Sequence, residues 1–151
     1  MKYCLRTVTW RFHETNEALP ELKGRASLSI QSPNDLYLSY RSLFSDKVRE
    51  RFVVFWLDSS NKVTGLEVIS EGILNSSLCH PREVFRGAII STAASIVVAH
   101  NHPSGSREPS REDIEITRQL VESGKILGIP VHDHIIFGDG GYTSFAERQL
   151  M

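Results

Sequence analysis

The sequence has little cysteine, no long apolar run and no excess of charge of either sign. Only two of its 151 residues are cysteine, and Cys4 and Cys79 form neither a CxxC pair nor a disulfide framework. No run of about 18 apolar residues is present, which excludes a transmembrane helix. The first residues also lack the apolar core and cleavage site of a signal peptide. These features predict a cytoplasmic protein with reduced thiols and no membrane partner.

The charge balance bears on the partners of the chain. The formal net charge is −1 and the sequence pI is about 6.6. A dedicated nucleic-acid binder usually carries a basic face, so the balance gives no support to a nucleic-acid partner. Basic residues gather at 47–51 and again at Arg107 and Arg111. We interpret both groups as solvated surface; the alternative for Arg107 and Arg111 is a grip on a substrate carboxylate or a phosphate.

The apolar pattern predicts one α/β domain. Apolar residues make up 40% of the chain, enough for a single compact core. We predict helices that begin at Ser32, Pro81 and Ser110, the last ending near Gly124, and strands at residues 52–57, 62–70, 94–99, 129–137 and 142–145. Strands that alternate with helices, together with hairpins, indicate a mixed β-sheet flanked by helices. We assign residues 32–151 to this domain, and residues 1–31 to an N-terminal extension with strand-like alternation at 7–12 and 26–30.

The most informative segment is HNHPSGSREPSRED at residues 100–113. It follows a short β-branched run, so His100 and His102 should lie on the same side at the end of a buried strand. Asp113 follows in the first turn of the next predicted helix. Two imidazoles and one carboxylate can hold a zinc ion and leave one coordination position open for water. The segment therefore predicts metal-assisted hydrolysis.

Asp113 also has a simpler interpretation. Ser110 and Asp113 have the spacing of a capping box, in which a serine N-cap pairs with an acidic residue three positions later. That box prefers Glu or Gln at the second position, and Glu112 would already serve the helix dipole. For Asp113 alone, the sequence leaves both roles open, helix cap and metal ligand. The paired histidines favour the metal site.

These residues carry a resemblance to a known family. The pattern from His100 and His102 to Ser110 and Asp113 resembles the JAMM signature of the JAB/MPN metallopeptidase superfamily. The strings HNHPSG, PSREDIEIT, NSSLCHPREVF and DHIIFGDGGYTSF resemble the bacterial RadC family, over residues 32–145. The resemblance implies the JAB/MPN fold, which is similar to that of cytidine deaminases. It also suggests a short form of the family, without the helix-hairpin-helix segment of longer relatives.

The resemblance implies a role for each residue of the motif. His100, His102 and Asp113 would ligate zinc, and the Ser110 hydroxyl would hydrogen-bond the developing oxyanion. A glutamate on an earlier strand would act as general base, and Glu50 stands where the family has its E-x-F pattern. Glu71 is the rival for that role and Glu67 a more distant one. The implied activity is zinc-dependent hydrolysis of a peptide or isopeptide bond in a peptide or protein substrate.

Several alternatives stay open at this point. His132 and His134 form a second HxH pair, which we interpret as structural hydrogen bonding rather than as a second metal site, although His134 could orient a ligand. Cys79 is interpreted as a small buried residue. The alternative functions are a DNA-repair-associated accessory protein, after the traditional label of the family, and a metal-bound interaction module without turnover.

Overall fold

The computed structural model describes residues 7–13, 28–72 and 79–151. Their core is a five-stranded sheet with the strand order β2-β1-β3-β4-β5. In chain order the elements are α2 (Pro33–Tyr40), the short 3-10 helix η2 (Arg41–Phe44), β1 (Glu50–Leu57), β2 (Val63–Gly72), α3 (Pro81–Ile90), β3 (Ser95–Asn101), α4 (Arg111–Leu127), β4 (Val131–Gly138) and β5 (Gly141–Ser144). None of the helices in these described segments has the length and apolar character that a membrane crossing requires.

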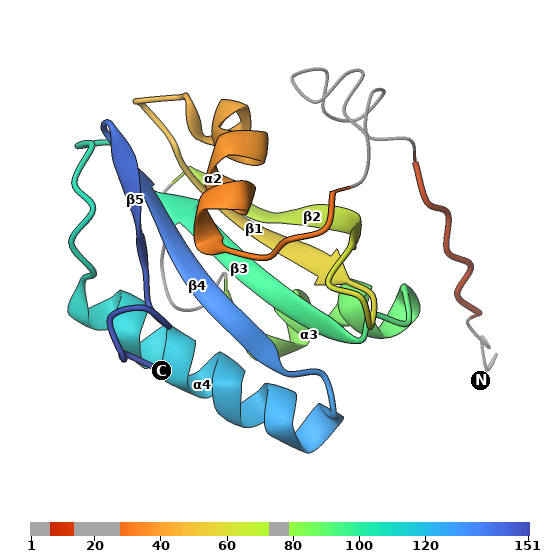
Figure 1. Ribbon diagram of the computed structural model, residues 1–151. Helices are drawn as coiled ribbons and strands as arrows, with labels where there is room; N and C mark the ends of the chain where they lie inside the picture. Colours follow the sequence, from red (N-terminus) through yellow and green to blue (C-terminus); the bar gives the residue numbers. More distant parts are fainter. Residues whose placement is uncertain (1–6, 14–27, 73–78) are drawn as a thin grey trace, which may run out of the picture.

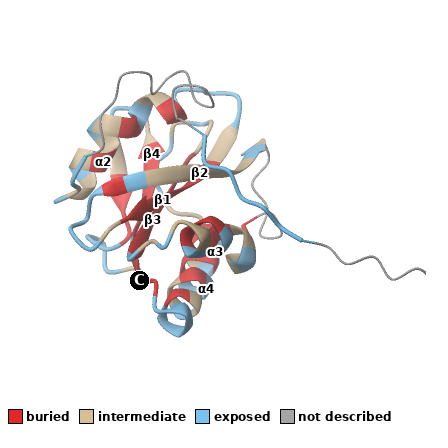
Figure 2. Ribbon diagram, turned by 90° about the vertical axis from the view of Figure 1, so that its right-hand side faces the viewer, coloured by how far each residue is buried: buried red, intermediate tan, exposed pale blue. Residues whose placement is uncertain are grey.

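The elements form three layers. Helix α2 covers one face of the sheet, and α3 and α4 cover the other (Figures 1 and 2). Strands β3 and β4 are parallel and are joined through α4, whereas the other neighbouring strands are antiparallel. The predicted α/β fold with a mixed sheet is therefore confirmed.

Side-chain alternation along the central strands divides the interior into two cores. Val53 and Phe55 of β1 pack on the α2 side, while Phe52 and Val54 pack on the side of α3 and α4. Strand β3 lies in the middle of the sheet and is buried along its whole length. This explains why residues 96–99 are a continuous apolar run rather than an alternating one.

Two details of the predicted elements are wrong. Residues 7–13 are exposed and form no strand, so the alternation at 7–12 does not reflect pairing. Helix α4 continues past Gly124 and ends at Leu127, and its C-cap Gly128 adopts the left-handed conformation with φ 69°. Gly124 instead allows close packing, because a Cβ there would lie 2.5 Å from the carbonyl oxygen of Ile129.

The extension at residues 1–31 is only partly covered. Residues 1–6 and 14–27 lie outside the described part of the chain, and with them the first two residues of the predicted strand at 26–30. Ser29 forms an isolated antiparallel bridge with Lys62. The assignment of residues 1–31 as a separate extension stays a prediction.

Candidate metal centre

The strand register brings three side chains of the predicted site to one end of the sheet. Strands β1 and β3 are antiparallel, with Phe52 opposite His100. Glu50 lies two residues before Phe52, and His102 two residues after His100. Because side chains alternate along a strand, Glu50, His100 and His102 approach one another on the α3–α4 side. The N-terminus of β1 thus meets the C-terminus of β3 at the site.

The loop after His102 is held in place by its own contacts. The Nδ1 atom of His102 lies 3.1 Å from the carbonyl oxygen of Ser106. Gly105 has a φ of +80°, and its carbonyl accepts a 2.9 Å hydrogen bond from the amide of Asp139 at the β4–β5 turn. A Cβ on Gly105 would clash with the Asp139 side chain. The loop therefore packs on the β4–β5 turn before it reaches α4.

Helix α4 delivers Asp113 through a complete capping box. The Ser110 hydroxyl accepts a 3.1 Å hydrogen bond from the Asp113 amide, and the Asp113 carboxylate accepts a 2.7 Å hydrogen bond from the Ser110 amide. The reciprocal bonds satisfy two N–H groups that a helix start leaves unpaired. They also fix the direction in which the Asp113 carboxylate points.

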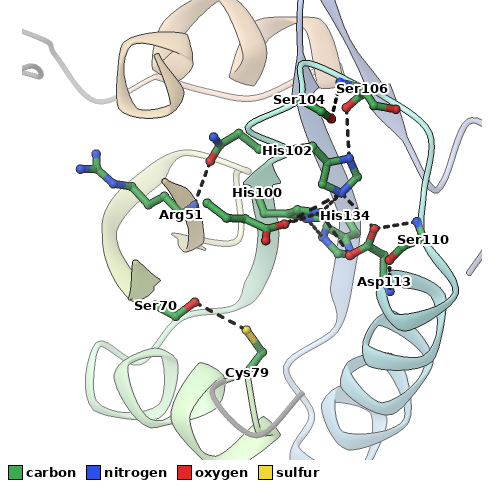
Figure 3. Close-up of polar contacts among 12 residues, drawn as sticks. Arg51, Ser70, Cys79, His100, His102, Ser104, Ser106, Ser110, Asp113 and His134 are labelled. Atoms are coloured by element: carbon green, nitrogen blue, oxygen red, sulfur yellow. Dashed lines mark hydrogen bonds and ion pairs between the residues drawn. The ribbon is translucent and has the colours of Figure 1, made fainter. Parts of the chain in front are cut away.

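The side chains of His100, His102 and Asp113 meet at this point (Figure 3). The Nε2 atoms of His100 and His102 are 3.0 Å apart, and each lies 3.2 Å from an oxygen of Asp113. The nearest oxygen of Glu50 is farther away, 3.9 Å from His100 Nε2 and 4.0 Å from His102 Nε2. Glu50, His100 and His102 also offer ligand atoms that all lie within 4.8 Å of one another, and these described residues form a group that could hold a metal ion.

The shorter distances favour His100, His102 and Asp113 as the ligand set. Zinc bonds of about 2.0–2.1 Å place the donor atoms of a tetrahedral site about 3.3 Å apart. The three separations of 3.0–3.2 Å are close to that value, whereas the distances to Glu50 exceed it. The donor set thus fits a tetrahedral ion with one position left open.

The electrostatics of the cluster call for a cation. Burial alone would raise the pKa of Asp113, but the His100 and His102 rings beside the carboxylate outweigh burial and hold this pKa well below its usual range. The hydrogen bond with Asp113 in turn raises the pKa of His102. The buried carboxylate is therefore charged, and either a proton on His102 or a metal ion balances it.

One side of the cluster is open to solvent. His100 and Asp113 are buried, whereas the side chains of His102 and Glu50 are 16% and 18% exposed. A cavity of about 400 Å³ adjoins His102, lined among others by Arg41, Phe44 and Phe137. The cluster is therefore accessible to solvent from the side of His102 and Glu50.

The structure separates Glu50 from its rivals. Glu71 stands opposite Arg51 in the register and forms a 2.8 Å ion pair with it, on the other face of the sheet from the histidines. Glu67 forms a 2.9 Å ion pair with Arg86 of α3. Of the three candidate bases, Glu50 is the one beside the histidines.

Comparison with known proteins agrees with this geometry. The family model for the RadC-like JAB domain matches residues 30–150. This chain belongs to that family. It is 56% identical over 126 residues to a UPF0758 protein of Moorella thermoacetica, covering 81% of this chain and 53% of the relative. It is 48% identical over 119 residues to a UPF0758 protein of Methanosarcina mazei, covering 79% and 52%. The chain thus spans about half the length of these curated relatives.

Asn101 has a place in this RadC-like JAB domain that the motif did not reveal. Its side chain points away from the histidines, accepts a 2.9 Å hydrogen bond from the amide of Arg51, and donates one of 3.0 Å to the carbonyl of Arg49. A third hydrogen bond, of 3.2 Å, goes to the carbonyl of Asp46. Asn101 therefore forms hydrogen bonds with the main chain on both sides of Glu50.

Within the described residues, the two histidines of the second HxH pair have different surroundings. His132 is exposed at an irregularity in the β3–β4 register, while His134 is fully buried. Asp133 accepts hydrogen bonds from the amides of His134 and Ala146 and from the Ser144 hydroxyl, as expected for a structural role. The Nε2 atom of His134 lies 2.8 Å from Nδ1 of His100. Only the register of neighbouring strands could have revealed that contact.

Proposed function

We propose that this domain is a zinc-dependent hydrolase of peptide or isopeptide bonds. The observation that carries the proposal is the cluster of two imidazole nitrogens and a buried carboxylate, 3.0–3.2 Å apart, with Glu50 beside it on the open side. Nitrogen and oxygen donors with one open position suit a hydrolytic zinc site, since structural zinc sites are usually closed by four protein ligands.

His100, His102 and Asp113 would hold the ion. When bound, zinc supplies a Lewis acid and makes water a competent nucleophile near pH 7. These ligands would come from a strand, a helix and a loop that is held by its own hydrogen bonds. His100 is the last but one residue of the central strand, Asp113 lies in the first turn of α4, and His102 is oriented by the Ser106 carbonyl. Ligands held by rigid elements would need little rearrangement to bind the ion.

Glu50 is proposed as the general base. It is partly exposed and lies next to both histidines. Within the described residues it forms no ion pair with Lys or Arg, whereas Glu67 and Glu71 do. From this position it can take a proton from the attacking water and later deliver it to the leaving amine. The hydrogen bonds of Asn101 with the main chain of Arg49 and Arg51 would hold Glu50 in place for both proton transfers.

Ser110 is proposed as the oxyanion donor. Its hydroxyl oxygen already accepts the hydrogen bond from the Asp113 amide, so the hydroxyl hydrogen is available for a second partner. A donor fixed by a helix cap needs little reorganisation when charge develops on the substrate carbonyl oxygen. The substrate would be a peptide or protein chain that enters beside His102.

A panel of peptide and isopeptide substrates tests the proposal, with zinc-loaded wild type compared with Glu50→Gln and Glu71→Gln. Glu71→Gln is the matched control, since it removes a carboxylate from the other face of the sheet. We expect hydrolysis by wild type and by Glu71→Gln, and its loss in Glu50→Gln at equal zinc content. Retained hydrolysis in Glu50→Gln would reject Glu50 as the base. Bound zinc without hydrolysis of any substrate would favour a metal-bound interaction module instead.

A further inference from the structure

A buried chain of hydrogen bonds runs behind the metal cluster. His134 of β4 lies between His100 and Thr117 of α4, with its Nε2 atom 2.8 Å from Nδ1 of His100 and its Nδ1 atom 2.6 Å from the Thr117 hydroxyl. All three side chains are fully buried. The His134 ring stacks on Phe145 with ring centroids 4.6 Å apart.

The position of each hydrogen in this chain follows from Thr117. Its hydroxyl donates its only hydrogen to the Asp113 carbonyl oxygen, 2.6 Å away. It can therefore only accept from His134, whose Nδ1 must carry the ring hydrogen. The Nε2 atom of His134 is then an acceptor, and Nδ1 of His100 donates to it. If each imidazole ring carries one hydrogen, any other arrangement places two lone pairs or two hydrogens face to face, either between His100 and His134 or between His134 and Thr117.

This order of hydrogens decides which nitrogen of His100 can bind metal. With its hydrogen on Nδ1, His100 presents a bare Nε2, the atom that faces His102 and Asp113. The same hydrogen bonds also connect two of the proposed ligands. They run from His100 on β3 through His134 and Thr117 to the main-chain carbonyl of Asp113 on α4.

We propose that His134 and Thr117 are positioning residues that hold His100 in its metal-binding tautomer and tie it to Asp113. The inference rests on the proposed metal site, but it does not depend on catalysis. A hydrogen-bond partner behind a metal-binding histidine fixes the tautomer and the ring orientation, and its loss typically weakens metal binding by about 10–100-fold.

The variants for the test differ by single groups. Thr117→Val replaces the hydroxyl with a methyl group of similar size, while Thr117→Ser keeps the hydroxyl. His134→Phe fills the ring volume without its nitrogens. His132→Ala is the control on the same strand, since His132 is exposed. The readout is the zinc affinity of the full chain, measured by competition with a chelator, with thermal unfolding as a check of folding.

We expect Thr117→Val and His134→Phe to weaken zinc binding by about 10–100-fold, and Thr117→Ser and His132→Ala to stay within about threefold of wild type. The double variant should bind zinc no more weakly than His134→Phe, because both changes break the same chain. Folded Thr117→Val with wild-type zinc affinity would overturn the proposal.

A measurement on the unaltered protein keeps the proposal testable if the variants fail to fold. Nitrogen chemical shifts of the histidine rings in zinc-loaded wild type report the tautomers directly. The expected result is a hydrogen on Nδ1 of both His100 and His134, and a hydrogen on Nε2 of either ring would overturn the inference. Failure of wild type to bind zinc would remove both this inference and the proposed function. Zinc binding without hydrolysis would remove only the proposed function.

Discussion

The Asp113 carboxylate accepts a 2.7 Å hydrogen bond from the Ser110 amide, and the Ser110 hydroxyl accepts one of 3.1 Å from the Asp113 amide. The carboxylate that caps α4 is also the one that lies 3.2 Å from the Nε2 atoms of both His100 and His102. Helix cap and proposed metal ligand are therefore the same group. The two roles predicted as alternatives for Asp113 are compatible.

Asp113→Asn should separate these two roles. The amide oxygen of Asn can still accept from the Ser110 amide, so the helix start should persist, whereas the negative charge that attracts the metal is gone. We expect a far-ultraviolet circular dichroism spectrum like that of wild type and a loss of zinc affinity of at least about 100-fold, beyond the typical effect of losing an outer partner. Glu112→Gln, one residue away and exposed, is the control. Wild-type zinc affinity in Asp113→Asn would show that Asp113 is only a cap.

Ser110→Ala should affect both stability and catalysis. Loss of the N-cap hydroxyl should cost about 1 kcal/mol in the free energy of unfolding, and loss of the oxyanion donor should lower kcat by about 10²–10³. Helix α2 offers a matched control, because Ser32 and Asp35 form the same capping box. Ser32→Ala should cost similar stability and leave hydrolysis unchanged. Equal hydrolysis by the two serine variants would leave Ser110 with a structural role alone.

Asn101→Ala should disturb Glu50 without removing a ligand. The change leaves the Arg51 amide and the carbonyls of Arg49 and Asp46 without their partner, which should cost about 1–3 kcal/mol in the free energy of unfolding. Hydrolysis should fall while zinc still binds. In the Glu50→Gln background the same change should lower the remaining activity no further, since Asn101 acts through Glu50. Additive losses in the double variant would point to a general structural effect.

Zinc binding should weaken as the pH falls, because zinc and a proton compete for His102. The hydrogen bond with Asp113 raises the pKa of His102 above its ordinary value of 6.5. In the apoprotein the raised pKa stabilises the fold below about pH 6.5, and this contribution is lost as the pH rises through the raised value. The increase in Tm that zinc produces should therefore grow between about pH 6 and pH 8. A thermal shift independent of pH over this interval would contradict the assignment of His102 as a ligand.

The sequence predicted well those features that depend on short stretches of chain. The helix start at Ser32 and the capping box at Ser110 were predicted from residues within one helical turn, and the buried strand before His100 from a short apolar run. The alternation at residues 7–12 was misleading, because a strand exists only where another strand pairs with it. Gly124 suggested a helix end, but it serves close packing instead.

Two contacts of the site depend on pairing between strands. Asn101 was not singled out from the sequence, and an orienting role for His134 was only the less favoured interpretation. Asn101 holds a segment about 50 residues earlier in the chain, and His134 contacts His100 because β4 lies beside β3 in a particular register. No local pattern encodes either contact. Glu50 was found through the family resemblance, while its separation from Glu71 follows from the face of the sheet on which each side chain lies.

The most direct test of the metal centre is diffraction at the zinc absorption edge from crystals of the zinc-loaded protein. The account predicts one anomalous peak bonded at about 2.0–2.2 Å to Nε2 of His100, to Nε2 of His102 and to an oxygen of Asp113, with Glu50 outside bonding distance. A peak bonded to Glu50 in place of Asp113, or no peak at this cluster, would contradict it.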